Sequence, residues 1–443
     1  MGPGIIRYPV VKCSKDSKGA FPVDDKQIFA ALEITGHEVR LIVGEFFNTR
    51  FNIIKVEQVP CTGLSLNAVE QPEEVVDAIQ KAAADASKLI GAPLQKVILA
   101  IPSVNMHRYS VKVTVPIEGI DGEITVENIR QAMRKAQTIN IGKGYALIQT
   151  DCVKYTVNGI STRRLPIGEK ARQLTVEIDM LCADRKLSFD LVGCVEKAGL
   201  SVMDIYLDIY AVSKEAALFE QSVDQNVIIL KLEREGTTLG LLNKGRVTSA
   251  VINPVGLASF AQALVEAYGM GMNEAMEQIK YSARLDEKVY GDMLVHIWSD
   301  ANGHSRTLSE KQLIECIQPR IQSWVQDVGN LCGPILQAGK TAVIITGEGG
   351  ELQGLDSLLR RHLNCEVRNY IPETIGGRNS GLTACLGLFY AYKDRLPITG
   401  YTDNSLDMEK FIRSVSYREA RAEGKPEDTL TNKLKGIIFD SRK

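Results

Sequence analysis

The chain has 443 residues, which is too long for one hydrophobic core, so two to four packed subdomains are expected. Hydrophobic residues make up 44% and charged residues 24%, and the formal net charge of -2 excludes a basic surface for nucleic acid. The sequence has no run of about 18 apolar residues that could span a membrane as a helix. A cytoplasmic protein is therefore expected.

The cysteines and histidines follow no pattern that predicts a metal site. Nine cysteines are scattered singly along the chain, and the five histidines lack metal-ligand spacing. We expect free thiols in a reducing compartment and predict no metal ligands.

The folded core begins with three strands, a helix and a fourth strand. Residues 1–27 are rich in Gly, Pro, Lys and Asp, which predicts an irregular extension. Apolar residues recur at helical spacing from Val75 to Ile90, which predicts a helix that ends at Gly91. The remaining runs are dense in β-forming residues and predict an antiparallel meander and one buried strand, at 29–34, 39–47, 51–59 and 96–101.

A small α+β insert is predicted at residues 103–178. It contains an amphipathic helix at 123–139 among predicted strands. After the insert the chain returns to the core with three more elements, namely a helix at 186–200, a strand at 202–210 and a helix at 211–221.

The second half of the chain repeats the form of the first. A second meander is predicted at 226–253, followed by helices, and residues 288–337 are predicted to be mostly helical. A buried strand at 342–347 then ends in the Gly-rich sequence GEGGELQG before another helix. Gly-rich backbone between a strand and a helix allows close approach to a nucleotide, although it also serves as a tight turn.

The composition changes after Arg395. Residues 396–428 predict a linker, and residues 429–443 predict a short amphipathic helix. Its apolar face is formed by Leu430, Leu434, Ile437 and Ile438. Such a helix can lie in a membrane interface, or it can dock on a protein core.

Several motifs together resemble the bacterial actin-like cell-division family FtsA, within the actin, sugar-kinase and heat-shock ATPase superfamily. LEITGHEVRLIVGE (32–45) is similar to the family's first phosphate loop, and NEAMEQIK (273–280) to a helix beside the adenosine. VGCVEKAGLSVMDIYLDIYAVSKEAAL (192–218) and VIITGEGGELQGLDSLL (343–359) resemble two further family segments. The insert falls where this family carries its 1C subdomain.

The resemblance implies an α/β, actin-like fold of two related halves with an FtsA-type 1C α+β insert. The implied subdomains are 1A (28–102, 179–212 and 376–395), 1C (103–178), 2A (213–253 and 338–375) and 2B (254–337). They are flanked by the extension, the linker and the membrane-targeting helix given above.

The resemblance also implies an ATP site, for which Mg²⁺ is doubtful. Its implied contacts are Glu33, Thr35, Gly36, His37, Lys231, Gly236, Thr237, Thr238, Gly256, Glu277, Lys280, Gly347, Glu348 and Gly349. Glu277 and Lys280 lie one helical turn apart and face either the adenosine or solvent as an ion pair.

The phosphate loops depart from the family pattern. Glu33 stands where the family has Asp, and Lys231 takes the place of the second loop's first Asp when loop length is kept. Alignment on Gly236-Thr237-Thr238 instead shifts the register by one and puts Leu239 at the last Asp. Neither Lys nor Leu can hold Mg²⁺ through water.

Two interpretations of these departures remain open. In the first, Lys231 lies against the phosphates and replaces the charge of the metal ion. In the second, residues 233–235 fill the space for the phosphates and abolish nucleotide binding. Asp208 is a weak candidate for orienting an attacking water, and no other catalytic residue is predicted. Little or no hydrolysis is expected.

The resemblance implies a polymer-forming adaptor, peripheral on the inner face of the cell membrane at the division site. Its implied partners are the FtsZ tail on subdomain 2B, the membrane surface, further copies of itself, and other division proteins through 1C. The charged surface near Arg284 and Lys288 is a candidate contact, or simply solvated. The alternatives are an actin-like pilus-assembly scaffold and an ATPase or kinase of the same superfamily.

Overall fold

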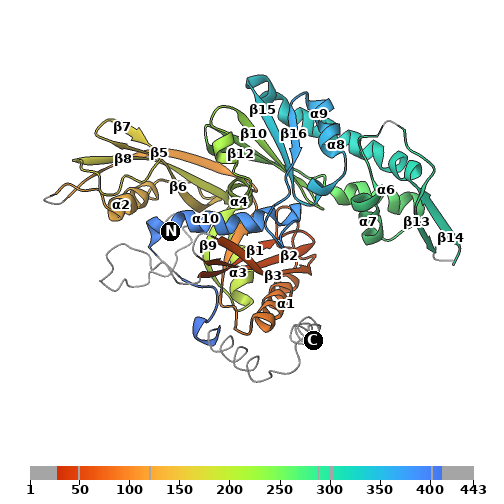
Figure 1. The fold of residues 1–443 in the computed structure, drawn as a ribbon, viewed down its shortest axis with the longest axis horizontal. Helices are drawn as coiled ribbons and strands as arrows, with labels where there is room; N and C mark the ends of the chain where they lie inside the picture. Colours follow the sequence, from red (N-terminus) through yellow and green to blue (C-terminus); the bar gives the residue numbers. More distant parts are fainter. Residues whose placement is uncertain are drawn as a thin grey trace, which may run out of the picture.

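The computed structural model describes residues 27–47, 50–118, 121–287, 289–299, 303–400 and 403–411. The predicted extension lies outside these ranges except for Gln27, and the predicted membrane helix lies outside them entirely. Figure 1 shows an elongated molecule with two sheets near its centre and a smaller unit at either end. No helix in the described ranges has both the length and the hydrophobicity needed to cross a bilayer.

The first sheet has the strand order β3-β2-β1-β4-β9. Its first three strands form the predicted antiparallel meander, and the other two pair in parallel. A strand buried on both faces of its sheet reads as an apolar run, as FAALEI of the first strand does. The strands are β1 (Gln27–Ile34), β2 (Glu38–Phe47), β3 (Arg50–Pro60), β4 (Lys96–Ile101) and β9 (Ser201–Leu207). Helices α1 (Pro72–Ile90) and α3 (Arg185–Lys197) pack together against it.

The second sheet repeats this topology, with the order β12-β11-β10-β15-β16. Three antiparallel strands are again followed by two parallel ones, which confirms the prediction of two related halves. The strands are β10 (Asn226–Leu232), β11 (Thr237–Asn243), β12 (Arg246–Asn253), β15 (Thr341–Thr346) and β16 (Glu366–Asn369). A short 3-10 helix, η1 (Glu348–Glu351), and helix α9 (Leu355–Leu363) follow β15.

Two helices lie between the sheets. Helix α4 (Asp208–Glu215) contacts β10 and β12, while α10 (Thr383–Thr399) contacts β1, β4 and α4. The predicted strand at 202–210 is wrong at its end, because pairing with β4 stops at Leu207 and Asp208 begins α4. The predicted helix at 211–221 is interrupted at Ala217, whose φ of 49° precedes the short α5 (Leu218–Gln221).

The insert forms a separate unit, at the left of Figure 1. Its sheet has the order β5-β8-β6-β7, and its one described helix, α2, is the helix predicted at 123–139, which starts after Thr125. Thr125 and Asn128 form a capping box. The elements are β5 (His107–Pro116), α2 (Val126–Ala136), β6 (Tyr145–Val157), β7 (Ile160–Thr162) and β8 (Gln173–Asp184).

The unit at the right of Figure 1 combines helices with a hairpin. The long helix α8 confirms that residues 288–337 are mostly helical, but the hairpin of β13 and β14 before it was not predicted. His296 stacks on Trp298 along β13. The elements are α6 (Leu257–Tyr268), α7 (Met272–Ser282), β13 (Leu294–Ser299), β14 (Ser305–Ser309) and α8 (Glu310–Ala338).

The start of the predicted linker belongs to the folded core. Helix α10 continues to Thr399, and Leu406 is only 3% exposed. Ser405 forms backbone hydrogen bonds with Ile28 and Gln95 where β1 and β4 of the first sheet begin. The linker prediction is therefore wrong for residues 396–400 and 403–411.

Candidate functional site

The two hairpin turns predicted to hold phosphates face each other between the halves. Thr35, Gly36 and His37 connect β1 to β2, and the turn at 233–236 connects β10 to β11. A Cβ atom on Gly36 would lie 2.5 Å from Cγ of Glu235, so glycine allows the two turns to approach. The structure thus brings the predicted loops together.

Lys231 is engaged with carboxylates from the first half. Its Nζ lies 2.6 Å from Glu33 Oε1 and 3.0 Å from Asp208 Oδ2, and the lysine is 6% exposed. Burial alone would lower the pKa of Lys231, but the carboxylates of Asp208 and Glu33 outweigh it and raise the pKa. The ammonium is therefore held by side chains of this chain, rather than free to face phosphate.

Arg40, which was not predicted from the sequence, lies in the cleft between the two halves, where the two turns meet. It is 0% exposed. Its guanidinium contacts both oxygens of Glu233 in the second half, at 3.1 and 2.8 Å. On the side of the first half it reaches Glu38 Oε1 at 2.6 Å and Glu33 Oε2 at 3.4 Å. It also donates to the backbone oxygen of Gly381 at 2.7 Å. The one sequence signal for Arg40 is a charge inside an apolar strand.

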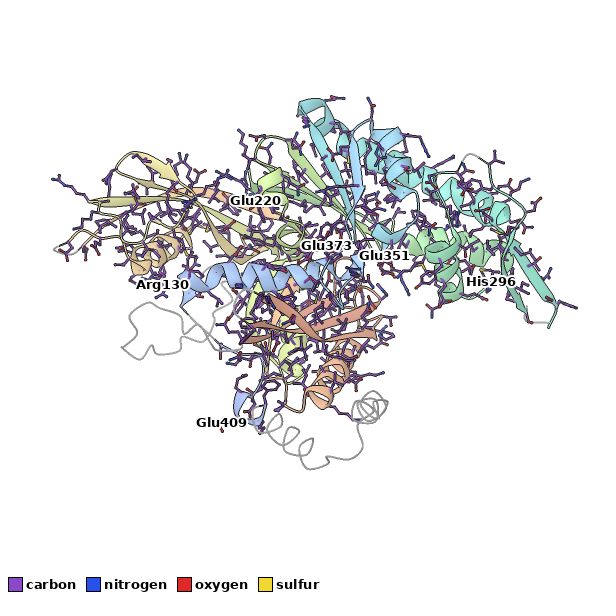
Figure 2. The ribbon with its side chains drawn as sticks, in the orientation of Figure 1. Arg130, Glu220, His296, Glu351, Glu373 and Glu409 are labelled. Atoms are coloured by element: carbon purple, nitrogen blue, oxygen red, sulfur yellow. The ribbon has the colours of Figure 1, made fainter. Side chains whose placement is uncertain are left out.

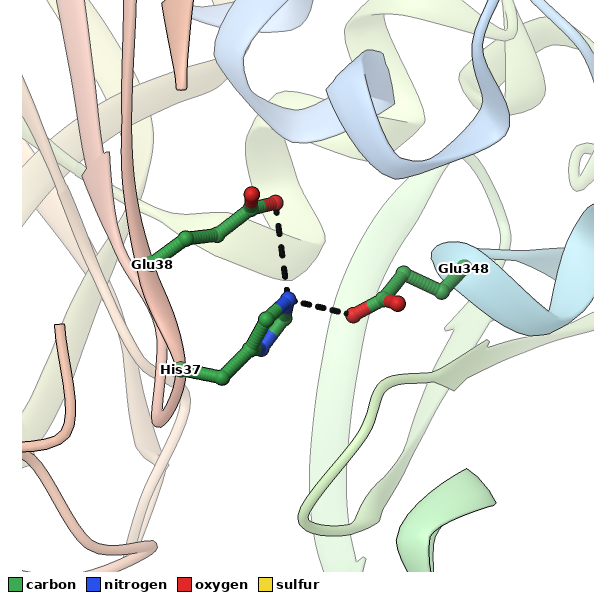
Figure 3. Close-up of side chains that lie close together, drawn as sticks. All are labelled: His37, Glu38 and Glu348. Atoms are coloured by element: carbon green, nitrogen blue, oxygen red, sulfur yellow. Dashed lines mark ion pairs between the residues drawn. The ribbon is translucent and has the colours of Figure 1, made fainter. Parts of the chain in front are cut away.

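His37 lies between two carboxylates from opposite halves, as Figure 3 shows. Its Nε2 lies 2.7 Å from Glu348 Oε1 and 3.6 Å from Glu38 Oε1. Burial alone would lower the pKa of His37, but the carboxylates outweigh it and raise the pKa to about 9. The imidazolium thus acts as a cation between the halves.

The cleft holds more carboxylates than cations. Two permanent cations, Lys231 and Arg40, are in ion-pair contact with five carboxylates, namely Glu33, Glu38, Asp208, Glu233 and Glu348. This excess of carboxylates does not fit a magnesium triphosphate, because a phosphate site needs surplus positive charge and hydrogen-bond donors.

The space near the turns divides into a small cavity and a larger hollow. The cavity lined by Glu33, Gly36 and Thr238 measures about 70 Å³. The hollow on the second half measures about 320 Å³ and is lined by Arg234, Met276, Glu277, Lys280, Tyr281 and Glu348, among others. Of these two, only the hollow, which borders the residues predicted to meet adenosine, has room for a ligand of nucleoside size.

Glu277 and Lys280 both border the hollow but do not pair with each other. Lys280 Nζ lies 3.1 Å from Glu351 Oε2, while Glu277 is exposed. Figure 2 labels Glu351 near the centre of the molecule, beside α10. The prediction that these side chains meet adenosine remains a prediction.

The other predicted contacts have structural roles. Thr237 accepts a hydrogen bond from Trp324 Nε1 at 2.9 Å and donates to the backbone of Val255. A Cβ on Gly256 would lie 2.4 Å from backbone atoms of the β10–β11 turn. Gly347 has a φ of 78°, and a Cβ on Gly349 would collide with Leu232. These glycines let the β10–β11 turn, β10 and η1 pack closely.

Asp208 is held in a way that leaves little for catalysis. Its Oδ1 accepts hydrogen bonds from Ser103 N at 3.0 Å and Ile209 N at 2.8 Å, and its Oδ2 faces Lys231. A carboxylate bound on both oxygens is poorly placed to orient an attacking water. The expectation of little or no hydrolysis stays a prediction.

The chain is similar to known proteins over most of its length. Residues 103–182 match the family model described as the SHS2 domain inserted in FtsA. The cell division protein FtsA of Bacillus subtilis is 23% identical over 375 residues, covering 83% of each chain. FtsA of Neisseria meningitidis is 23% identical over 381 residues, covering 83% of this chain and 90% of that protein.

A solved structure of a PilM-PilN type IV pilus biogenesis complex resembles the fold. The TM-score is 0.55 at 15% identity, and the match covers 81% of this chain and 97% of that one. At this identity the likeness shows a shared fold and nothing about function.

Proposed function

Because this chain is a relative of the FtsA cell-division proteins with an actin-like fold, we propose that it is a polymer-forming adaptor that anchors FtsZ filaments to the membrane. The observation that carries the proposal is the FtsA-type insert, which matches over residues 103–182 and lies between β4 and α3 of the first half. The match of the insert to the FtsA family model is the reason to prefer this proposal to a pilus-assembly scaffold, since the overall fold is similar to both.

The adaptor would hold its partners through separate parts. The proposal places the membrane contact in the helix at 429–443, the FtsZ tail on the unit formed by residues 254–337, and other division proteins on the insert. This makes the protein peripheral on the inner membrane face at the division site. A short helix gives marginal membrane affinity, so many copies in a polymer would supply the avidity.

The unit formed by residues 254–337, which we call the hairpin unit, offers an apolar surface that supports the FtsZ contact. Val289, Met293, Leu294 and Ile297 are 82%, 66%, 56% and 61% exposed. Leu294 and Ile297 lie on β13, and the other two lie in the segment just before it. Exposed apolar side chains this near to one another in the chain are a common feature of peptide-binding surfaces. Arg284 instead pairs with Glu287 at 3.3 Å, and Lys288 lies outside the described residues. We therefore place the FtsZ tail on the apolar face of the hairpin.

The membrane part is tested by sedimentation of the chain with liposomes. The composition changes after Arg395, but residues 403–411 still pack on the core. The matched truncation therefore ends after Phe411. The full chain should carry FtsZ filaments into the liposome pellet, and the truncated chain should leave both proteins in solution. Equal pelleting by the two chains contradicts the tether.

The FtsZ part is tested with single substitutions on the hairpin. Leu294→Glu or Ile297→Glu should abolish binding of an FtsZ tail peptide while the chain still pellets with liposomes. A matched control, Ile160→Glu, replaces an exposed apolar side chain of the insert (74% exposed) and should leave peptide binding unchanged. Loss of peptide binding in the control alone would move the contact to the insert.

The proposal gives a nucleotide a structural role and no catalytic one. We propose that an adenine nucleotide, if it acts on this chain, is a structural ligand held by its adenosine in the hollow beside Lys280. The charges of the cleft speak against a bound magnesium triphosphate, so ATP with Mg²⁺ remains a prediction from the resemblance. An ATPase or kinase is disfavoured for the same reason.

Calorimetry separates these possibilities. Adenosine, ADP and ATP with Mg²⁺ should bind with similar affinity, because the phosphates gain no contacts. Tight binding of ATP with Mg²⁺ and weak binding of adenosine would show that Lys231 faces phosphate after all. The titration of ATP with Mg²⁺ should then be repeated with Lys231→Asp, which restores the residue typical of the family. Stronger binding to this variant would show that the loop can regain a metal site.

A further inference from the structure

We propose that the insert latches the second half of the molecule through Arg246, at the end of the second sheet that lies opposite the cleft. Arg246 is the first residue of β12, and β5 of the insert lies beside this strand (Figure 1). The latch would hold the angle between the two halves from outside the cleft. The inference concerns contacts within one chain and does not rest on the adaptor function.

The latch consists of ion pairs and a hydrogen bond. Arg246 Nη2 lies 2.7 Å from Glu177 Oε1 on β8 of the insert. Its Nη1 lies 3.5 Å from Asp179 Oδ1 and 3.4 Å from Ser110 Oγ, and these two residues face each other across β5 and β8. The side chains of Arg246, Glu177 and Asp179 are mostly buried, so water and salt screen these pairs less than an exposed pair.

The turn between β11 and β12 is shaped for close contact with the insert. Asn243 pairs with Arg246, which leaves a two-residue turn of Lys244 and Gly245 with φ angles of 54° and 71°. Positive φ at both central residues is typical of the tightest hairpin turns. Arg163 of the insert donates from Nη2 to the backbone oxygen of Lys244 at 3.2 Å, and a Cβ on Gly245 would lie 2.8 Å from Arg163 Nη1. The turn thus presents its backbone to a second arginine.

The insert is fixed more firmly to the first half than to the second. Arg130 of α2 donates to the backbone oxygens of Ile398 and Thr399, at 2.6 and 2.9 Å, at the end of α10. Ile398 also packs against the apolar core of the insert, and α10 packs on β1 and β4 of the first sheet. Among the described residues, no side chain of the second sheet joins that core. Because the contact with the second half is polar, it can separate while the insert stays on the first half.

The second sheet is held at three points along β11. One end of this strand leads from the turn in the cleft, and the other end leads to the turn at the insert. Between them, a Cβ on Gly240 would lie 2.3 Å from a side-chain carbon of Ile209, so the middle of β11 packs closely on α4. The seven residues of β11 span roughly 23 Å. A rotation of the sheet about α4 that parts the cleft therefore also moves the β11–β12 turn against the insert.

The latch is tested with pulsed EPR distances in the full chain. A keto amino acid at exposed Ile160 of the insert and at exposed Glu366 of β16 carries the two nitroxides, so the native cysteines stay unlabelled. The labelled parent chain should give one narrow distance distribution. Arg246→Glu should broaden it and shift it to longer distances, because Glu177 then repels the turn, whereas Arg246→Lys should keep most of the narrow peak. An unchanged distribution in Arg246→Glu would overturn the proposal.

Two controls separate release of the latch from general loosening. A second label pair, at Ile160 and at exposed Lys81 of α1, reports the distance from the insert to the first half, and Arg246→Glu should leave it unchanged. Arg284→Glu reverses a charge of the hairpin unit that pairs with Glu287, and should change neither distance. A longer distance to Lys81 in Arg246→Glu, or equal broadening by Arg284→Glu, would overturn the latch.

Discussion

At the scale of single residues, Arg40 is the largest buried cation of the cleft. It joins Glu33 and Glu38 in the first half to Glu233 in the second, and no part of its side chain is exposed. Taking a charge out of water is costly unless its partners remain, so each member depends on the others. The cleft is therefore more sensitive to the loss of one charge than any surface ion pair.

Arg40→Leu should destabilise the chain by about 3–5 kcal/mol, because Glu233 then loses its nearest cation while it stays between the halves. Urea unfolding followed by circular dichroism measures the change. The control Arg284→Leu breaks an exposed pair with Glu287 and should cost less than about 1 kcal/mol. Equal costs would show that the cleft ion pairs contribute no more than surface ones.

A second residue, Glu215, makes stability depend on pH. Burial raises its pKa to about 7, and its Oε2 is buried without a hydrogen bond in the described structure. Because the folded-state pKa is raised, the native state binds this proton more readily than the unfolded chain does. The stability contribution is present below the ordinary pKa of 4.5 and is lost as the pH rises through about 7.

Glu215→Gln should therefore stabilise the chain by up to about 3 kcal/mol at pH 8.5 and by clearly less at pH 5.5. Thermal unfolding at both pH values gives the difference. Glu220→Gln removes an exposed carboxylate of the neighbouring α5 and should show no such pH-dependent gain. A gain of the same size at both pH values would mean that packing, and not the proton, is responsible.

At the scale of elements, the crossing of α4 and α10 fixes how the two sheets meet. A Cβ on Gly387 of α10 would lie 1.8 Å from the backbone oxygen of Ala211 in α4. No side chain fits at this distance, so the helices touch backbone to backbone.

Gly387→Ala should push α10 away from α4 and destabilise the chain by about 1–3 kcal/mol or more. Gly193→Ala is the matched control, because Gly193 lies within α3 and its added Cβ would meet nothing within 4 Å. That change should stabilise the chain by up to about 1 kcal/mol through helix propensity. Opposite signs in urea unfolding are expected, and two gains would contradict the close crossing.

Sequence patterns predicted the elements whose periodicity is set by burial. Both meanders, the insert and its helix were predicted correctly, because the burial of their apolar residues leaves a pattern in the sequence. The β13–β14 hairpin was missed because it is largely exposed and belongs to neither large sheet. The Asn-Gly pair at 302–303 was the available turn signal.

The site was predicted as a meeting of loops but not in its chemistry. The sequence could place Lys231 and Glu33 at the two turns, because each turn follows an apolar strand. It could not show that Lys231 binds Glu33 and Asp208, or that Arg40 spans the halves, since these contacts join residues far apart in the chain. Local periodicity carries no information about such pairs.

At the scale of the whole molecule, the cleft is closed by the chain's own charges. Lys231 with Glu33, Arg40 with Glu233 and His37 with Glu348 each join the two halves. In a nucleotide-dependent protein of this fold, a bound ligand would supply such bridging contacts. Here the chain's own ion pairs supply these contacts, so the closed arrangement should need no nucleotide. A nucleotide that binds the closed and open arrangements equally well does not change their populations.

The radius of gyration from small-angle X-ray scattering should therefore be the same with and without ATP and Mg²⁺. Lys231→Gln should increase it, because three carboxylates near the lysine then lose their shared cation and repel across the cleft. Lys214→Gln breaks the pair with Asp394, which joins α4 to α10 outside the group of carboxylates around Lys231, and should leave the radius unchanged. Compaction of the wild type by ATP would show instead that closure depends on nucleotide.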